Sequence, residues 1–435
     1  MSSRMIRIGF VGCGVVGTGA LEILRSHAKT IEKRLGATLA VEQIAVRDPK
    51  RPRSEFVPTE LLTDDPFAVV RNPNVDIVVE AMGGLEPAGE LIREALDSGK
   101  HVVTANKALL AKKGDALFDL ARQQGLDLYF EAAVAGGIPI IRMLQEALAA
   151  DEILSIQGII NGTSNYVLTE MAERGLDFAI SLKAAQEAGY AEADPSLDIN
   201  GGDSAHKLAI LATLAFGVRV HPEHISTEGI DIVDAFDIEF ADGFDYAIRP
   251  IAIASRSESN VLDLRVHPAL VPIDSPLAHI TGAFNAVSVT GARVGTCLLS
   301  GPGAGPGPTA ISVVSDVIDI ARNLLKGASG RVPSFIHDEN AEPKVLAPGD
   351  LEARFYLRFT VRDESGVLSA ITGKLSEFAI SIEKMFQNVD QEDPGTATVV
   401  MLTHEAKEGA VREALQHIDA LPHTLAPTRL LRIVG

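Results

Sequence analysis

The stretch of sequence that decides the N-terminal fold is MIRIGFVGCGVVGTG, residues 5–19. Its apolar run Ile6–Val11 predicts a buried β-strand, which leads directly into a G-x-G-x-x-G pattern at residues 12–17. In such a pattern Gly12 permits a tight turn, Gly14 lets the backbone approach a pyrophosphate, and Gly17 lets the next helix pack on the strand. The N-terminal amides of that helix favour a phosphate. We therefore predict a dinucleotide site, with a tight turn without ligand as the alternative; its residues are Gly12, Gly14, Val15, Val16 and Gly17.

Strands and helices alternate through the first 140 residues. The expected strands are Ile6–Val11, Leu39–Val46, Ile77–Glu80, His101–Thr104 and Leu128–Glu131. Helical stretches such as 89–98 and 111–124 lie between them. This alternation predicts a parallel sheet covered by helices on both faces, which is a Rossmann domain over residues 1–140 in an α/β chain.

The rest of the chain predicts two further domains. Between residues 141 and 325, helical segments such as 203–216 mix with strand-like segments such as 153–161, which predicts an α+β domain. Residues 326–352 are rich in Gly, Pro and charged residues and predict a linker. Over residues 353–435 the order strand, helix, strand, strand, helix, strand predicts a ferredoxin-like module.

Composition narrows the class of protein. The 435 residues hold 39 Lys and Arg against 58 Asp and Glu, a net charge of −19, so the chain lacks the positive excess that nucleic-acid binding requires. Two cysteines cannot build a disulfide framework, which favours a reducing compartment. No apolar run reaches the roughly 18–20 residues that span a bilayer, and no signal-peptide pattern opens the sequence. We expect a cytoplasmic enzyme that binds neither membrane nor nucleic acid.

The residues after the second expected strand bear on the choice of cofactor. An acidic residue that would bind the ribose hydroxyls is not cleanly present; the strand ends at Val46-Arg47-Asp48, with Arg51 and Arg53 close behind. Arg47 can pair with a 2′-phosphate, which favours NADP. Asp48 keeps NAD open, and a solvated basic loop is the alternative to any contact.

Two lysines are candidates for chemistry. Lys107 follows the strand that ends at Thr104, and ligands of open parallel sheets bind beyond such strand ends, although a surface charge is the simpler interpretation. The stretch 192–207 carries four carboxylates and ends at Lys207, four residues after Asp203 and before an apolar helix. A partly desolvated lysine beside carboxylates can donate or accept a proton. The alternative is an ordinary ion pair at a helix start.

The segment 185–207 resembles homoserine dehydrogenase. The family pattern A-x3-G-x4-D-P-x2-D-x2-G-x-D-x3-K is met without a gap at Ala185, Gly189, Asp194, Pro195, Asp198, Gly201, Asp203 and Lys207. The stretches 161–166 and 104–107 also look like family motifs, so the resemblance covers about residues 5–325. It implies reversible reduction of L-aspartate 4-semialdehyde to L-homoserine with NAD(P)H, on the route to threonine, methionine and isoleucine. It also implies a Rossmann domain followed by a catalytic and dimerisation region.

The resemblance assigns roles to individual residues. It implies that Lys207 is the acid/base, that Glu192 and Asp203 bind the substrate's ammonium group, and that Lys107 is a second active-site lysine near Thr104 and the cofactor. It also implies a sodium ion held by oxygen atoms, for which a glycine turn without metal is the alternative; its ligands are Glu131, Val134, Gly136 and Ile138. The late glycine loop at 301–307 resembles one that returns to the cofactor through Gly303 and Gly305, with an ordinary coil as the alternative.

The C-terminal module resembles an ACT domain in the stretches 363–368 and 380–387. Gly366 opens a helix whose free amides, beside Asp363, could hold the carboxylate of an amino acid. The resemblance implies allosteric control, with threonine as the leading effector, or a purely structural module. Such modules often pair edge to edge across subunits, so we expect a homodimer or homotetramer. The rival functions are a dehydrogenase for another small hydroxy substrate and a non-catalytic amino-acid sensor.

Overall fold

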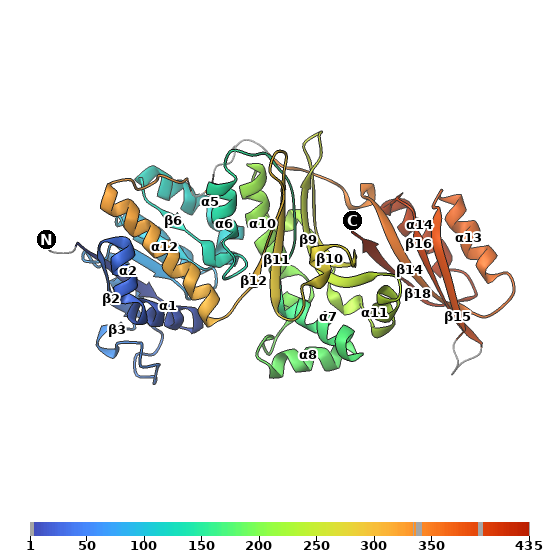
Figure 1. Cartoon of the computed structure of the whole chain (residues 1–435), viewed down its shortest axis with the longest axis horizontal. Coiled ribbons are helices and arrows are strands. Elements are labelled where there is room, and N and C mark those ends of the chain that lie inside the picture. The colour runs from blue at the N-terminus through green and yellow to red at the C-terminus, as the bar shows by residue number, and fades with distance from the viewer. Residues whose placement is uncertain (1–3, 334, 336–341, 390–394, 435) are drawn as a thin grey trace. The chain divides into compact units, whose positions relative to one another are not determined.

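The computed structural model describes residues 4–333, 335, 342–389 and 395–434 (Figure 1). Its contacts divide the chain into two compact units. The first consists of Met1–Gly162, Gly202–Ile225 and Ala283–Pro343, and the second of Thr163–Gly201, Ser226–Gly282 and Lys344–Gly435. Of the predicted linker 326–352, residues 334 and 336–341 lie outside the described residues.

The first unit is built on a parallel sheet in the order β3-β2-β1-β4-β5-β6. Its strands are β1 (Met5–Val11), β2 (Thr38–Ala45), β3 (Leu62–Thr63), β4 (Ile77–Glu80), β5 (His101–Thr104) and β6 (Leu128–Tyr129). The helices around it are α1 (Val15–Ser26), α2 (Ala28–Leu35), α3 (Pro66–Arg71), α4 (Ala88–Asp97), α5 (Lys107–Gln124) and α12 (Pro306–Lys326). The predicted Rossmann-like fold is confirmed.

From Ile8 to Val11, strand β1 is apolar on both faces because helices cover both, whereas Arg7 near its start is only partly buried. Ile6, Ile8 and Phe10 pack in one core with residues of α1 and α12, two helices that lie together although they are far apart in the sequence (Figure 1). On the other face, Gly9 lies against Val69 of α3 and Val75. A continuous apolar run is what a strand buried on both faces requires.

The first unit also holds the helix that carries Lys207. That helix, α10 (Gly202–Phe216), is buried along most of its length. The other elements are α6 (Ile140–Arg142), which continues as a π-helical turn at Met143–Ala147, and the strands β7 (Ile153–Ile159), β11 (Phe284–Gly291) and β12 (Gly295–Pro302). β11 pairs antiparallel with both β7 and β12.

The second unit contains a sheet in the order β9-β10-β18-β14-β16-β15. Its main strands are β9 (Tyr246–Arg256), β10 (Val261–Pro272), β14 (Glu352–Arg362), β15 (Ile382–Val389), β16 (Thr396–Thr403) and β18 (Thr424–Ile433), with short strands β8 (Ser226–Thr227), β13 (Lys344–Val345) and β17 (Ala406–Lys407). The helices are α7 (Gly162–Arg174), α8 (Phe178–Glu187), α9 (Ser196–Ile199), α11 (Ala235–Asp242), α13 (Val367–Glu377) and α14 (Glu408–Asp419). The predicted C-terminal order of strands and helices is confirmed.

The C-terminal module is not an isolated domain on a tether. Its strand β18 pairs in parallel with β10 at Arg432 and Ile433, so the module extends the sheet that β9 and β10 begin. One face of the module's sheet packs on the module's own helices, α13 and α14. The other face, through residues such as Tyr356 and Val400, packs on a core to which α7, α8 and α11 contribute. A sequence pattern of period two predicts a strand with one buried face, but does not show which elements cover either face.

Candidate active site

In the turn after β1, the three glycines differ in how much space surrounds them. Gly12 has a φ of +96°, and a Cβ there would lie 2.7 Å from the backbone of Ala81. A Cβ on Gly17 would lie 2.7 Å from the carbonyl oxygen of Gly12, so this glycine lets α1 pack against the turn. At Gly14, which precedes Val15 at the start of α1, a Cβ would meet no atom within 4 Å. The open side of the turn therefore lies at Gly14, where a phosphate can approach the helix N-terminus.

A cavity of about 640 Å³ adjoins this turn and the end of β2. Arg47, Asp48 and Arg51 line it, and both Arg47 and Arg51 are exposed. Arg53 also lines the cavity, but its guanidinium donates to the carbonyl oxygens of Cys13 and Asp48, at 3.0 and 3.2 Å. The size suits a nucleotide, and the arginines give one end of the cavity a positive charge.

A buried carboxylate gathers the two predicted lysines. Asp203 lies in the first turn of α10; its Oδ2 is 2.7 Å from Nζ of Lys207 and its Oδ1 is 3.0 Å from Nζ of Lys107. The side-chain amide of Asn161 donates to Asp203 Oδ2 at 2.8 Å, and Lys207 Nζ donates to the carbonyl of Ile160 at 2.7 Å. Lys207 is 8% exposed and Asp203 is 4% exposed, so both are buried, whereas 36% of the Lys107 side chain is exposed.

The charges of the cluster favour an ionised Asp203. Burial alone would raise the pKa of this carboxyl, but the charges of Lys207 and Lys107 and the hydrogen bonds from Lys207 and Asn161 hold it well below its usual value. One fixed negative charge thus lies between two ammonium groups, an arrangement that suits a lysine that donates a proton.

Lys107 owes its position to polar side chains at the carboxyl ends of β4 and β5. The buried Glu80 accepts hydrogen bonds from the Thr104 hydroxyl, at 2.6 Å, and from the backbone N–H groups of Met82 and Gly83. Thr104 Oγ1 in turn accepts from the backbone of Asn106, whose side chain caps α5 directly before Lys107. Glu80, Asn106 and Asn161 were not predicted as functional. The available signal was the presence of Glu80 at the carboxyl end of a central strand.

Glu192 belongs to the second unit, apart from Lys207 and Asp203. It is exposed on the segment between α8 and α9. Two hydroxyls at the start of α7 hold that segment: Thr163 donates to the carbonyl of Tyr190 at 2.6 Å and Ser164 to that of Asp198 at 2.9 Å. The motif at 161–166 therefore has a structural reason, since it anchors the segment that carries Glu192.

The predicted sodium ligands lie in a loop with two consecutive left-handed residues, Ala135 and Gly136. The Glu131 carboxylate accepts from the backbone N–H groups of Ile141 and Arg142, and the Gly136 carbonyl accepts from Ser312. Burial and the neighbouring Asp316 raise the pKa of Glu131 to about 7. Val134 and Ile138 are buried there as well. Among the residues with described positions, no group of three or more His, Cys, Asp or Glu side chains could hold a metal ion.

The late glycine loop comes back to the turn after β1. Gly305, with a φ of +128°, precedes α12, and the carbonyl oxygen of Pro306 would lie 2.4 Å from a Cβ on Gly19 of α1. Gly303 lies so close to Asn285 that a side chain would collide with it. Pro306 lines a second cavity, of about 440 Å³, together with Gly14 and Val15, so the loop closes one side of the nucleotide turn.

The predicted regulatory residues lie where β14 passes into α13. Gly366, with a φ of +96°, is the residue before α13, which begins at Val367. The backbone N–H of Asp363 donates to the carbonyl of Gly395 at 2.9 Å. The start of α13 therefore lies next to the turn that carries Asp363, and the regulatory role of these residues stays a prediction.

A parallel sheet with a glycine turn after β1 and a lysine after β5, both at the carboxyl edge, is the arrangement of a dinucleotide-binding domain. Comparisons with known families identify it further. Residues 12–131 match the homoserine dehydrogenase NAD-binding domain, residues 139–318 match homoserine dehydrogenase, and residues 355–423 match the ACT domain. The chain belongs to the homoserine dehydrogenase family, and its function is that of a homoserine dehydrogenase. The resemblance seen in the segment 185–207 is confirmed.

Similar proteins extend over the whole chain. The homoserine dehydrogenase of Pseudomonas aeruginosa is 41% identical over 432 residues, 99% of each chain, and that of Synechocystis sp. is 42% identical over 437 residues, 99% of this chain and 100% of the other. The crystal structure of a homoserine dehydrogenase from Thiobacillus denitrificans has a TM-score of 0.93 and 43% identity, covering 100% of this chain and 99% of that one. A hyperthermophilic archaeal homoserine dehydrogenase mutant in complex with NADPH is 27% identical, with a TM-score of 0.62 over 74% of this chain and 98% of that one. In the part of the chain that the structure describes, no helix is long and apolar enough to cross a membrane.

Proposed function

We propose that the chain catalyses the reversible reduction of L-aspartate 4-semialdehyde to L-homoserine, on the route to threonine, methionine and isoleucine. The observation that carries this proposal is the contact of the buried Asp203 with the buried Lys207 and with the partly exposed Lys107, in the same unit as the glycine turn. The lysine has the charge partner and the burial that a proton donor needs.

A reduced nicotinamide cofactor held at the glycine turn of residues 12–17 would supply the hydride for the aldehyde carbon. Lys207 donates a proton from Nζ to the carbonyl oxygen as that oxygen becomes an alcohol, and accepts it back in the reverse direction. Asp203 keeps the Lys207 ammonium group in place at 2.7 Å. Lys107 adds a second positive charge beside the oxygen on which negative charge develops, and such fixed charges stabilise the transition state.

The α-ammonium group of the substrate requires a negative partner. Asp203 and Glu192 are the proposed partners, and since Asp203 already contacts two lysines, the exposed Glu192 is the carboxylate with more room for another cation.

NADP is the proposed cofactor. Arg47 and Arg51 line the nucleotide cavity and are exposed, so either can meet a 2′-phosphate, whereas Arg53 already binds backbone carbonyls. Asp48 in the same cavity is the residue that would serve NAD. The archaeal relative that was solved with NADPH supports the choice of NADP.

The remaining roles follow from the resemblance and the geometry together. A sodium ion can be held at Glu131, because each carboxylate oxygen that accepts a backbone hydrogen bond keeps a second lone pair for the metal. No step of the reaction runs through this ion. Threonine would bind at Asp363 and Gly366. A homo-oligomer would form through β15, the outer strand of the described sheet, where Met385 and Phe386 are exposed. We place the enzyme in the cytoplasm.

A comparison of substrates tests the proposal. The purified chain should reduce L-aspartate 4-semialdehyde and should fail with aldehydes of the same length that lack the α-ammonium group. Equal rates with both would refute ammonium recognition and favour a dehydrogenase for another substrate. Binding of threonine without turnover of either aldehyde would favour the amino-acid sensor.

A further inference from the structure

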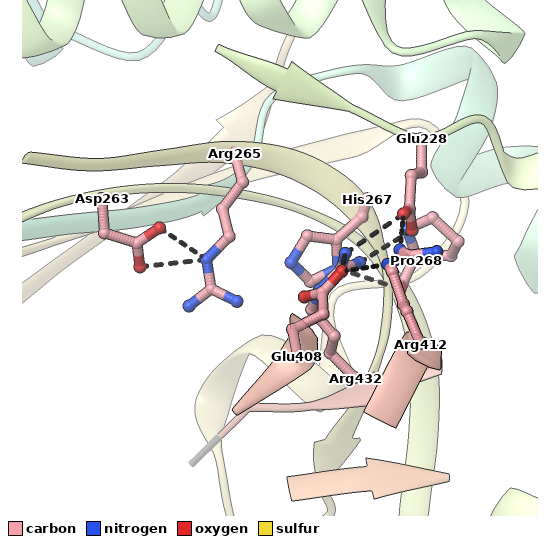
Figure 2. A network of polar contacts seen from close by, with 8 residues as sticks. All are labelled: Glu228, Asp263, Arg265, His267, Pro268, Glu408, Arg412 and Arg432. Carbon is pink, nitrogen blue, oxygen red and sulfur yellow. Dashed lines mark hydrogen bonds and ion pairs between the residues drawn. The ribbon is translucent and has the colours of Figure 1, made fainter. Parts of the chain in front are cut away.

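A partly buried group of charges joins the C-terminal module to the rest of the second unit (Figure 2). At its centre lies Arg432 of β18, which is 4% exposed. Around it lie Glu408 and Arg412 of α14 and Glu228, which directly follows β8. We name these four residues the Arg432 cluster.

Arg432 is held between two carboxylates. On one side its Nη1 and Nη2 donate to Glu228, at 2.7 and 3.1 Å. On the other side its Nε and Nη2 donate to Glu408, at 2.8 and 2.6 Å. Bidentate contacts of this kind fix orientation as well as distance, so Glu228 is held firmly against the C-terminal module.

Arg412 completes the cluster and balances its charge. Its Nη2 lies 2.6 Å from Glu228 Oε1 and its Nε lies 2.7 Å from Glu408 Oε1, so two cations meet two anions. Burial would raise the pKa of Glu228, but the hydrogen bonds and charges of Arg432 and Arg412 lower it well below its usual value. The adjacent His267 is fully buried; burial and the two arginines Arg432 and Arg265 lower its pKa to about 3, so it adds no charge.

The backbone on either side of Glu228 touches the end of the segment 189–201, which carries Glu192 and is called the substrate segment below. A Cβ on Gly201, which has a φ of +83°, would lie 3.6 Å from the carbonyl oxygen of Glu228 and 3.7 Å from Thr227. A Cβ on Gly229 would lie 2.9 Å from the carbonyl oxygen of Ile199. Residues 227–229 therefore pack against 199–201: a side chain at Gly229 would collide with Ile199, and at Gly201 the two segments are in van der Waals contact, with a positive φ that favours glycine.

The residues of this contact are close in the sequence to the residues that we propose bind the substrate. Residue 201 is only two positions before Asp203, and the segment 189–201 contains Glu192. A shift of residues 227–229 would thus move the end of the segment that carries Glu192, two positions before Asp203. Small displacements of positioning groups have large kinetic consequences, up to about 100-fold for 1 Å.

We propose that Glu228 is a positioning residue, through which the C-terminal module holds the end of the substrate segment in place. The proposal rests on the proposed substrate roles of Glu192 and Asp203. It implies that a change in the module, such as the binding of an amino acid, alters the affinity for the amino-acid substrate more than that for the cofactor. The link runs from α14 and β18 through Arg432 and Glu228 to Gly201.

The test is Glu228→Gln in the full chain, with kcat and both KM values measured for L-homoserine and NADP. We expect the KM for L-homoserine to rise about tenfold, with kcat and the KM for NADP within about twofold of the unchanged protein. The matched control is Asp234→Asn, since Asp234 also binds an arginine of the module, Arg358, but joins it to α11 instead. This control should lower the melting temperature without raising the KM for L-homoserine.

Two further measurements separate positioning from loss of stability. In the pair Glu228→Gln and Arg432→Gln, the double variant should show no larger KM than the worse single variant, because both break one contact. Hydrogen exchange of the segment 189–201 should be faster in Glu228→Gln than in Asp234→Asn.

Equal KM values in Glu228→Gln and in the unchanged protein, or equal exchange in the two single variants, would overturn the proposal. If the unchanged protein does not turn over L-homoserine, the proposed function fails. Faster exchange of the segment 189–201 in Glu228→Gln would still support the positioning role, and unchanged exchange would overturn it.

Discussion

Replacing Lys207 with alanine tests the proton donor directly. The substitution removes the ammonium group that lies 2.7 Å from Asp203 Oδ2 and 2.7 Å from the carbonyl of Ile160. Asp203 keeps Lys107 and Asn161 as partners, so its charge stays partly balanced. The nucleotide turn at residues 12–17 is not among these contacts, which is why the cofactor should still bind.

The expected loss follows from the role of a positioned acid. Such a group contributes about 10²–10⁴ in rate, so kcat for Lys207→Ala should fall by about that factor, equivalent to about 3–5 kcal/mol of barrier. Stability should fall too, because a buried ion pair loses one partner, at a cost of about 3–5 kcal/mol. Lys207→Met keeps more of the side-chain volume and should show the same kinetic loss with better packing.

The assay follows the nicotinamide absorbance during oxidation of L-homoserine, with NADP affinity measured separately by calorimetry. Added ammonium or methylamine should restore part of the rate in Lys207→Ala, because a small amine can take the place of the missing group. An unchanged kcat would refute the role of Lys207. A loss of rate that follows entirely from weaker NADP binding would do the same.

Three other changes test separate parts of the structure. Gly14→Ala should keep the melting temperature, since its Cβ meets no protein atom within 4 Å, but should weaken NADP binding. Gly12→Ala should lower the melting temperature and also weaken NADP binding, because its Cβ would lie 2.7 Å from Ala81. Equal melting temperatures of the two variants in calorimetry would count against this distinction. Arg47→Ala should raise the KM for NADP about 10- to 100-fold and leave that for NAD nearly unchanged, and a parallel loss with both cofactors in steady-state kinetics would remove the phosphate contact. The pKa of Glu131 is raised in the folded protein from 4.5 to about 7, so the native state binds more protons than the unfolded state between these values, and the free energy of unfolding should fall as pH rises through that window. Denaturant titrations of Glu131→Gln should show a shallower decline there, and an identical slope would contradict the shift.

The sequence predicted well those features that are local. The glycine turn was predictable because the G-x-G-x-x-G spacing is local, and at Gly17 the steric neighbour is Gly12 itself, whereas the neighbour of Gly12 is the distant Ala81. The contact between Asp203 and Lys207 was predictable because residues four apart share a helix face. The strands of the C-terminal module were predictable because their apolar residues alternate.

Contacts between distant elements were not predictable from one sequence. Lys107 meets Asp203 only because of how α5 and α10 pack, and Arg432 meets Glu228 only because β18 pairs beside β10. The approach of α12 to α1 at Gly19 likewise depends on the whole first unit. The predicted domain boundaries and the roles of the individual site residues stay predictions.

The measurement that tests the central claim most directly is the oxidation of L-homoserine by the purified full chain with NADP, with the product identified chemically. The account predicts that NADPH and L-aspartate 4-semialdehyde form in equal amounts. A folded chain that binds NADP but produces neither would contradict it.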